Sequence, residues 1–136
     1  MSELINRDHA TGYAVAVLII TPQGVPLIRD PKKPVPVFWK LPGGRSNALE
    51  TAEQTAVREI EEEIGITIKE KELGIIHEED RGNHVLIIFR INLSALPQLK
   101  KRGDEGEEIK IFSPQEILSM NDFFPNHLRV VETILK

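Results

Sequence analysis

The stretch GRSNALETAEQTAVREIEEEIGI, residues 44–66, decides the fold of this chain. Thr51 is followed three residues later by Gln54, a capping box that predicts the start of a helix. Alanine or isoleucine recurs every four residues, at positions 52, 56, 60 and 64, and forms the apolar stripe of that helix. Gly65 stands where a left-handed residue commonly ends a helix. The stretch therefore predicts one amphipathic helix with defined ends.

Three carboxylates share one face of this predicted helix. Glu59, Glu62 and Glu63 fall at positions i, i+3 and i+4, which are neighbours on a helix, whereas Glu61 points elsewhere. Like charges at this spacing repel each other, and divalent cations remove the repulsion. Mg²⁺ prefers oxygen ligands and is commonly held by a few carboxylates together with substrate phosphates. The face predicts a cation site that receives a phosphate ester; a solvated acidic surface is the alternative.

The spacing of these residues resembles the signature of the MutT/Nudix hydrolases. Every fixed position of that signature is filled: Gly44, five residues, Glu50, seven residues, Arg58-Glu59-Ile60, one residue, Glu62-Glu63, one residue, Gly65-Ile66. The preceding residues 38–44, FWKLPGG, are also similar to the family. Leu49 and Thr55 differ from the glycine and alanine that relatives often carry, but both lie at free positions. The resemblance implies a single domain over residues 1–136 with an α/β (α+β) Nudix-type sandwich, a mixed β-sheet packed between helices.

The resemblance also implies a role for each matched residue. The ligands of Mg²⁺ or Mn²⁺ would be Gly44, Glu59, Glu62 and Glu63. Glu50 and Arg58 would support this site, with Arg58 paired to the carboxylates to fix their orientation.

A general base must take a proton from the attacking water. The resemblance implies that a box glutamate, Glu59 or Glu62, or a glutamate on a downstream loop serves as this base. Residues 104–108, DEGEE, are the candidate loop, where Glu105 is slightly favoured over Glu108 as catalytic residue or additional metal ligand. The choice among these glutamates stays open.

Basic side chains close to the motif are candidates for binding substrate phosphates, because the guanidinium fork matches phosphate geometry. Arg29 and Arg45 are the best placed. Trp39 and Phe38 could stack on a base, but packing in the core is favoured. The four histidines show no ligand spacing and are interpreted as structural or solvent-exposed: His9, His77, His84 and His127.

The remaining elements follow from apolar runs and turn signals. Predicted strands are Tyr13–Ile20 with Val25–Arg29 as its hairpin partner, residues 38–41, residues 72–78 and 84–93 joined by a turn, and residues 109–112. A short helix capped by Ser113 has Pro114 at its first position, and residues 126–136 form a closing amphipathic helix.

Composition limits the class of protein. The hydrophobic content of 40% and charged content of 28% are typical of soluble globular domains, and the absence of cysteine excludes a thiol nucleophile and a cysteine-based zinc site. Ten of the 21 acidic residues lie in residues 50–63 and 104–108, while the rest of the chain carries 16 basic and 11 acidic residues. This acidic focus is unlike the basic stripe of a duplex-binding protein. No signal peptide or membrane span is evident, so we expect a cytoplasmic protein without a membrane partner; a homodimer is also considered.

The predicted function is metal-dependent hydrolysis of a diphosphate bond in a nucleoside diphosphate linked to another group X, by attack of water at phosphorus. A nucleoside triphosphate or a similar small nucleotide is favoured as substrate, because sequence marks of relatives specific for ADP-ribose, dinucleoside polyphosphates or coenzyme A are absent. One alternative is a non-catalytic Nudix module that senses a nucleotide or binds a protein. Another is an RNA 5′-end pyrophosphohydrolase, for which the basic residues 100–102 are slight support.

Overall fold

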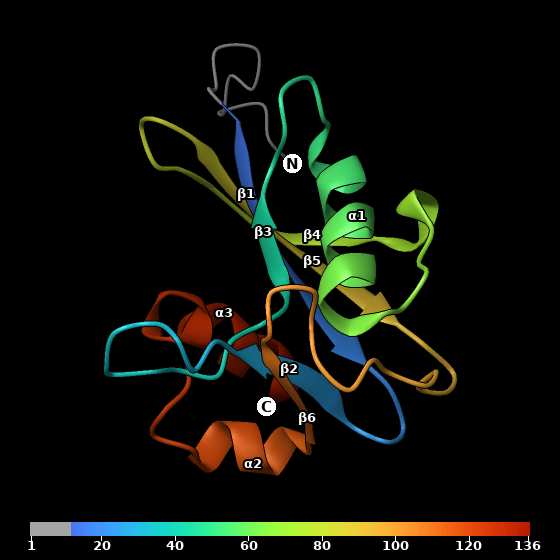
Figure 1. The fold of residues 1–136 in the computed structure, drawn as a ribbon, viewed down its shortest axis with the longest axis vertical. Helices are drawn as coiled ribbons and strands as arrows, with labels where there is room; N and C mark the ends of the chain where they lie inside the picture. Colours follow the sequence, from blue (N-terminus) through green and yellow to red (C-terminus); the bar gives the residue numbers. More distant parts are fainter. Residues whose placement is uncertain (1–11) are drawn as a thin grey trace.

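A mixed four-stranded sheet forms the centre of the computed structural model, which describes residues 12–136 (Figure 1). Its strand order is β3-β1-β5-β4, with β1 parallel to β5 and antiparallel to β3, and β4 antiparallel to β5. The strands of this sheet are β1 (Tyr13–Ile20), β3 (Gly43–Arg45), β4 (Gly74–Asp80) and β5 (Val85–Asn92). The interpretation of His9 lies outside the described residues.

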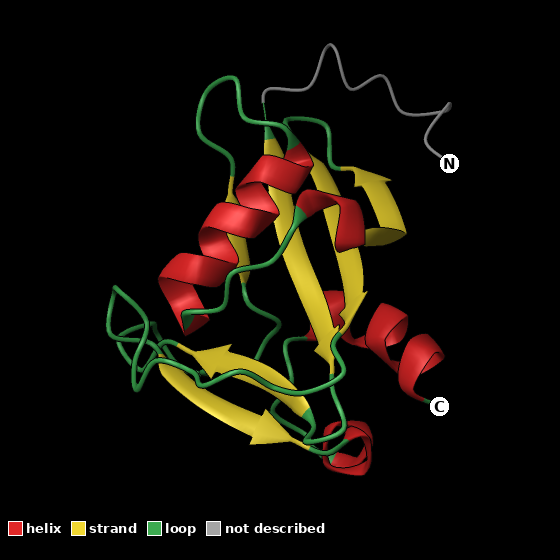
Figure 2. Cartoon of the chain, turned by 90° about the vertical axis from the view of Figure 1, so that its right-hand side faces the viewer, coloured by secondary structure: helices red, strands yellow, loops and turns green. Residues whose placement is uncertain are grey.

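Helices pack on both faces of this sheet, so the predicted architecture of a mixed sheet between helices is confirmed (Figures 1 and 2). The helices are α1 (Ala52–Ile64), the 3₁₀ turn η2 (Glu70–Glu72), α2 (Pro114–Ser119) and α3 (Pro125–Leu135). One apolar core joins the sheet to α1, and a second joins its other face to α2 and α3. Trp39 is buried in the second core, as favoured from the sequence. Among the described residues, no helix is both long and apolar enough to cross a bilayer.

Helix α1 has the ends that its sequence predicts. The Thr51 hydroxyl accepts a hydrogen bond from the Gln54 amide at 3.0 Å, and the Gln54 side chain accepts one from the Thr51 amide at 2.9 Å. Gly65 adopts φ 82°, a left-handed conformation that glycine takes without strain. The stripe is buried at Ala52, Ala56, Ile60 and Ile64. Thus the defined ends and the buried stripe fix the position of α1 on the sheet, and with it the position of its glutamates.

The hairpin predicted between Tyr13–Ile20 and Val25–Arg29 is wrong. Apart from one bridge between Thr21 and Gly24, β2 (Val25–Arg29) leaves β1 and pairs antiparallel with β6 (Glu108–Phe112) in a separate two-stranded sheet (Figure 2). The reason is that both edges of β1 are already paired, one with β3 and the other with β5. This second sheet brings the chain around residue 107 toward the end of α1.

Three other elements also differ from expectation in their boundaries. Residues 38–41 make only isolated bridges, and the strand forms instead at Gly43–Arg45 against β1. Gly43 permits that pairing, because a Cβ at this position would lie 2.0 Å from the Val15 carbonyl oxygen. The predicted strand at residues 72–78 is shifted to Gly74–Asp80, since the 3₁₀ turn Glu70–Glu72 occupies its beginning. The closing helix begins at Pro125, one residue earlier than predicted.

Candidate active site

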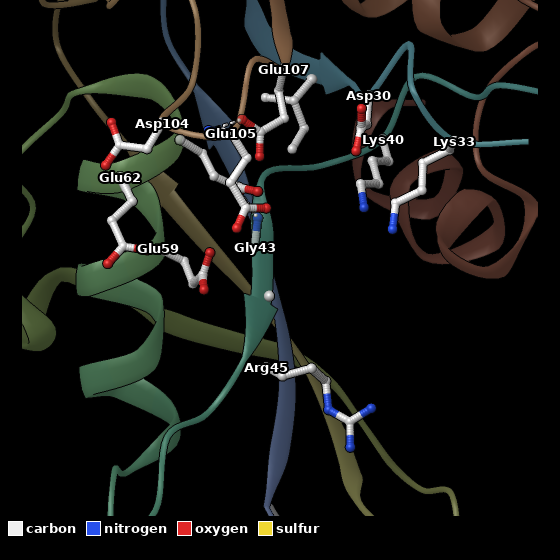
Figure 3. A pocket seen from close by; sticks show the side chains of 13 residues that line it. Asp30, Lys33, Lys40, Gly43, Arg45, Glu59, Glu62, Asp104, Glu105 and Glu107 are labelled. Carbon is white, nitrogen blue, oxygen red and sulfur yellow. Dashed lines mark hydrogen bonds between the residues drawn. The ribbon is translucent and has the colours of Figure 1, made fainter.

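A cavity of about 380 Å³ opens between α1, β3 and the loop that precedes β6 (Figure 3). Its polar lining is strongly acidic: seven carboxylates face three basic side chains. The carboxylates belong to Asp30, Glu59, Glu62, Glu63, Asp104, Glu105 and Glu107, and the basic side chains to Lys33, Lys40 and Arg45. The motif of residues 44–66 therefore lies at a cavity, and the chain brings acidic groups to it from three separate segments.

Arg58 organises the carboxylates of α1. Its guanidinium binds Glu50 at 2.7 Å, Glu59 at 3.0 Å and Glu62 at 3.2 Å, and it also donates a hydrogen bond to the Arg45 carbonyl oxygen at 3.0 Å. The hydrogen bond from Arg58 lowers the pKa of the Glu50 carboxyl to about 2, and the same bond raises the pKa of Arg58. Arg58 therefore stays charged and ties the loop before α1 to the acidic face of the helix.

Glu63 is a buried carboxylate, with 8% of its surface exposed. Its Oε1 accepts a hydrogen bond from the Gly43 amide at 2.6 Å, and in the described part of the chain no arginine or lysine lies within ion-pair distance of it. Burial raises the pKa of Glu63 to about 8, and burial also raises the pKa of Glu59. Such desolvated carboxylates gain most from a cation placed beside them.

Gly44 allows the helix to approach β3 closely. A Cβ at this residue would lie 2.5 Å from the carboxyl carbon of Glu59, so any other residue would displace that carboxylate. Glycine at this position therefore leaves the space that the Glu59 carboxylate occupies beside the cavity.

The loop before β6 contributes a carboxylate that sequence reasoning missed. Glu107 is 6% exposed, lines the cavity and accepts a hydrogen bond from the Glu105 amide at 3.1 Å. Glu105 also lines the cavity, whereas Glu108 lies outside its lining and binds Arg29 at 2.9 Å. Alternation along the chain into β6 could have separated Glu107 from Glu108, but the register of that strand was not visible from the sequence.

Of the two arginines expected to bind phosphates, Arg45 lines the cavity and Arg29 does not. Arg45 belongs to the lining, although its side chain extends away from the carboxylates (Figure 3). Arg29 does not line the cavity, because it binds Glu108 and stacks 4.4 Å from the centre of the Trp39 ring. Lys33 and Lys40, which sequence reasoning missed, occupy the wall opposite the glutamates.

The carboxylates surround the cavity without converging on one point. Within residues 12–136, no three acidic or histidine side chains come close enough to form a finished cation site. The contacts above give the reason: Glu59 and Glu62 turn toward Arg58, and Glu63 turns toward the Gly43 amide. The donor set still fits a hard cation, since it consists of oxygen atoms and includes two buried carboxylates, Glu63 and Glu107, that form no ion pair with a basic side chain of residues 12–136.

Comparisons with known proteins place this site in a family. A family model described as NUDIX domain matches residues 10–134. The chain is 37% identical over 89 residues to an ADP-ribose pyrophosphatase of Methanocaldococcus jannaschii, a match that covers 63% of this chain and 52% of that protein. It is 36% identical over 74 residues to the mouse nucleoside diphosphate-linked moiety X motif 6, covering 54% of this chain and 23% of that protein. The chain thus spans about half, or less, of the curated relatives it matches.

Solved structures share the fold. A MutT structure from a study of Aliivibrio salmonicida and Vibrio cholerae superposes with a TM-score of 0.72 at 27% identity, covering 91% of this chain and 96% of that one. A bifunctional NMN adenylyltransferase/ADP ribose pyrophosphatase of Francisella tularensis, in complex with AMP and a manganese ion, gives 0.69 at 22% identity and covers 91% and 40%. Because the family model matches nearly the whole chain and the motif of residues 44–66 lines the acidic cavity, this chain belongs to the Nudix family.

Proposed function

We propose that this protein is a metal-dependent pyrophosphohydrolase that cleaves the diphosphate bond of a nucleoside diphosphate linked to a group X. One observation carries the proposal: the acidic face of α1 opens into the same cavity as three carboxylates of the loop before β6 and two lysines. A cavity of this size and charge suits a diphosphate accompanied by cations. An acidic surface that is merely solvated would not bury Glu63 and Glu107.

The residues that would hold Mg²⁺ or Mn²⁺ are the Gly44 carbonyl, Glu59, Glu62 and Glu63, and we add Glu107 as a candidate because it is buried and lines the same cavity. When bound, a divalent cation polarises a phosphoryl oxygen and lowers the pKa of an attacking water.

The protein's own groups would position the reactants. Arg58 holds Glu59 and Glu62 by ion pairs, and Lys33 and Lys40 offer positive charge to the phosphates from the opposite wall. In the reaction, the oxygen of water bonds to phosphorus, the bond from phosphorus to the bridging oxygen breaks, and that oxygen leaves with the other product. A carboxylate takes the proton of the water.

Four glutamates remain candidates for this general base. Glu59, Glu62 and Glu105 all line the cavity. Glu108 is the weakest candidate, because its carboxylate is bound to Arg29 outside the lining. Replacing each glutamate by glutamine and measuring the pH dependence of kcat would identify the base, since only its loss removes the acid limb of the profile.

A small nucleotide such as a nucleoside triphosphate is the substrate class that we favour from the sequence. ADP-ribose is the second candidate, because the M. jannaschii relative carries the name ADP-ribose pyrophosphatase. The cytoplasmic location, the single domain and the homodimer remain predictions; light scattering after size-exclusion chromatography tests the last of these.

The proposal is tested by measuring Mg²⁺-dependent product release from nucleoside triphosphates, ADP-ribose, nucleotide sugars, dinucleoside polyphosphates and 5′-triphosphorylated RNA, with products identified by mass spectrometry. We expect chelator-sensitive cleavage that is abolished by Glu62→Gln. Glu61→Gln is the matched control, because Glu61 carries the same charge on the same helix but is exposed away from the cavity. Binding of nucleotides without turnover would instead support the sensor module, and cleavage confined to RNA would support the 5′-end enzyme.

A further inference from the structure

A second cavity, of about 350 Å³, lies beside the acidic one. The two cavities share Asp30, Lys33 and Lys40 in their linings. The rest of the second lining is apolar and consists of Pro36, Val37, Phe38 and Phe124. The two cavities therefore adjoin at these three residues, and together they make a cleft that is acidic at the α1 end and aromatic at the other end.

The side chains of Phe38 and Phe124 form one side of the aromatic cavity. The ring centres of Phe38 and Phe124 lie 6.3 Å apart at an interplanar angle of 55°, so the two rings already contact each other and no third ring fits between them. Phe124 is fixed by a hydrogen bond from its amide to the Trp39 carbonyl at 2.8 Å and by an edge contact with His127 at 5.0 Å. A flat ligand would thus stack on the outer face of this pair of rings and not between them.

The junction between the two cavities is basic. Lys33 and Lys40 line both cavities, and in the described part of the chain neither forms an ion pair with a carboxylate. Their ammonium groups are therefore available to an anion that lies between this pair of rings and the glutamates. A ligand complementary to the whole cleft has a flat apolar ring at one end and phosphate next to it.

We propose that the aromatic cavity holds the base of the nucleotide, and that Lys33 and Lys40 bind the phosphate that joins the nucleoside to the cleaved diphosphate. This assignment rests on the proposed function. Among the described residues, the aromatic lining has Asp30 and the two lysines as its polar members and contains no amide or hydroxyl side chain. The base is therefore held by stacking, with little readout of its hydrogen-bonding edge, so the enzyme accepts purine and pyrimidine nucleotides and discriminates against polyphosphates that lack a base.

The test is Phe38→Ala, with Phe38→Tyr to restore the ring and Val35→Ala as control, because Val35 is in the same loop, 86% exposed and outside both linings. Losing a stacking partner should raise KM for nucleoside triphosphates about 5- to 20-fold, with kcat changed less than twofold. The tyrosine and control variants should keep the KM of the wild type. KM for inorganic triphosphate should not respond to Phe38→Ala, whereas Lys40→Met should raise KM for both substrates.

Equal KM values for nucleotides in Phe38→Ala and the wild type would overturn the assignment, as would a preference above 50-fold for one base. Calorimetric binding of a non-hydrolysable nucleoside triphosphate provides a readout that does not need turnover. If the wild type binds this nucleotide but cleaves nothing, the proposed function fails while the base site is still tested. Equal affinity of Phe38→Ala and the wild type in that measurement overturns the base site alone.

Discussion

The buried Glu63 carboxyl makes the stability of the folded protein depend on pH. Burial raises its pKa from 4.5 to about 8, so between these values the folded protein holds a proton that the unfolded chain releases. The stability linked to this proton is fully present below pH 4.5 and is lost as the pH rises through 8. At pH 7 the cost approaches about 3 kcal/mol. Glutamine has no proton to lose and keeps the acceptor for the Gly43 amide, so Glu63→Gln should stabilise the metal-free protein by up to about 3 kcal/mol at pH 7.

The assay is urea unfolding in excess chelator at pH 4, 7 and 8.5, for the wild type, Glu63→Gln and the exposed control Glu61→Gln. We expect the gain of Glu63→Gln to be near zero at pH 4 and to grow toward pH 8.5, while the control follows the wild type. Added Mg²⁺ should raise the midpoint of the wild type more than that of Glu63→Gln, and the variant should lack turnover. A gain that is absent at pH 7, or equal at all three pH values, would refute the reasoning.

Three further predictions concern stability and the metal site. Burial lowers the pKa of His127 to about 4, so the stability linked to this imidazole is present above pH 6.5 and falls by up to about 3 kcal/mol as the pH drops through 4. Because the Glu63 proton acts in the opposite direction over the same range, the quantity to measure is the difference between wild type and His127→Phe in urea unfolding, in which the wild type should lose stability relative to the variant as the pH falls. Gly43→Ala should prevent β3 from pairing with β1 and yield little folded protein by circular dichroism. For Gly44→Ala, the atoms nearest to the new Cβ belong to the movable Glu59 carboxylate, so this variant should keep its melting temperature while its Mn²⁺ affinity, measured by electron paramagnetic resonance, drops. Ile60→Ala empties a fully buried site at the centre of α1 and should cost about 2–5 kcal/mol in urea unfolding.

The helix and the placement of its glutamates could be predicted because the signals are local. The capping box at Thr51, the left-handed Gly65 and the four-residue stripe lie within the helix itself or beside it, and the structure has all three. The common face of Glu59 and Glu62 follows from the same geometry, and both line the cavity.

The cavity's other walls could not be predicted, because they depend on pairings between distant segments. Arg29 and Glu108 are 79 residues apart and meet only because β2 pairs with β6 instead of β1. The same pairing turns Glu107 into the cavity and directs Arg29 away from it. Lys33 and Lys40 belong to no sequence motif, and only the tertiary structure shows that they line the cavity opposite α1 and are candidates for phosphate binding.

The sequence alone was enough to predict the helix, both of its ends and the face that its glutamates share, since helical periodicity and end signals act over a few residues. The family was predicted from the spacing of the motif. The tertiary structure alone decided which carboxylates are buried, which basic groups face them and that an aromatic cavity continues the acidic one. Burial sets the pKa of Glu63, and burial depends on Gly43 and β3 packing against α1 from another part of the chain. Local patterns therefore specify the donors, while long-range packing specifies their environment.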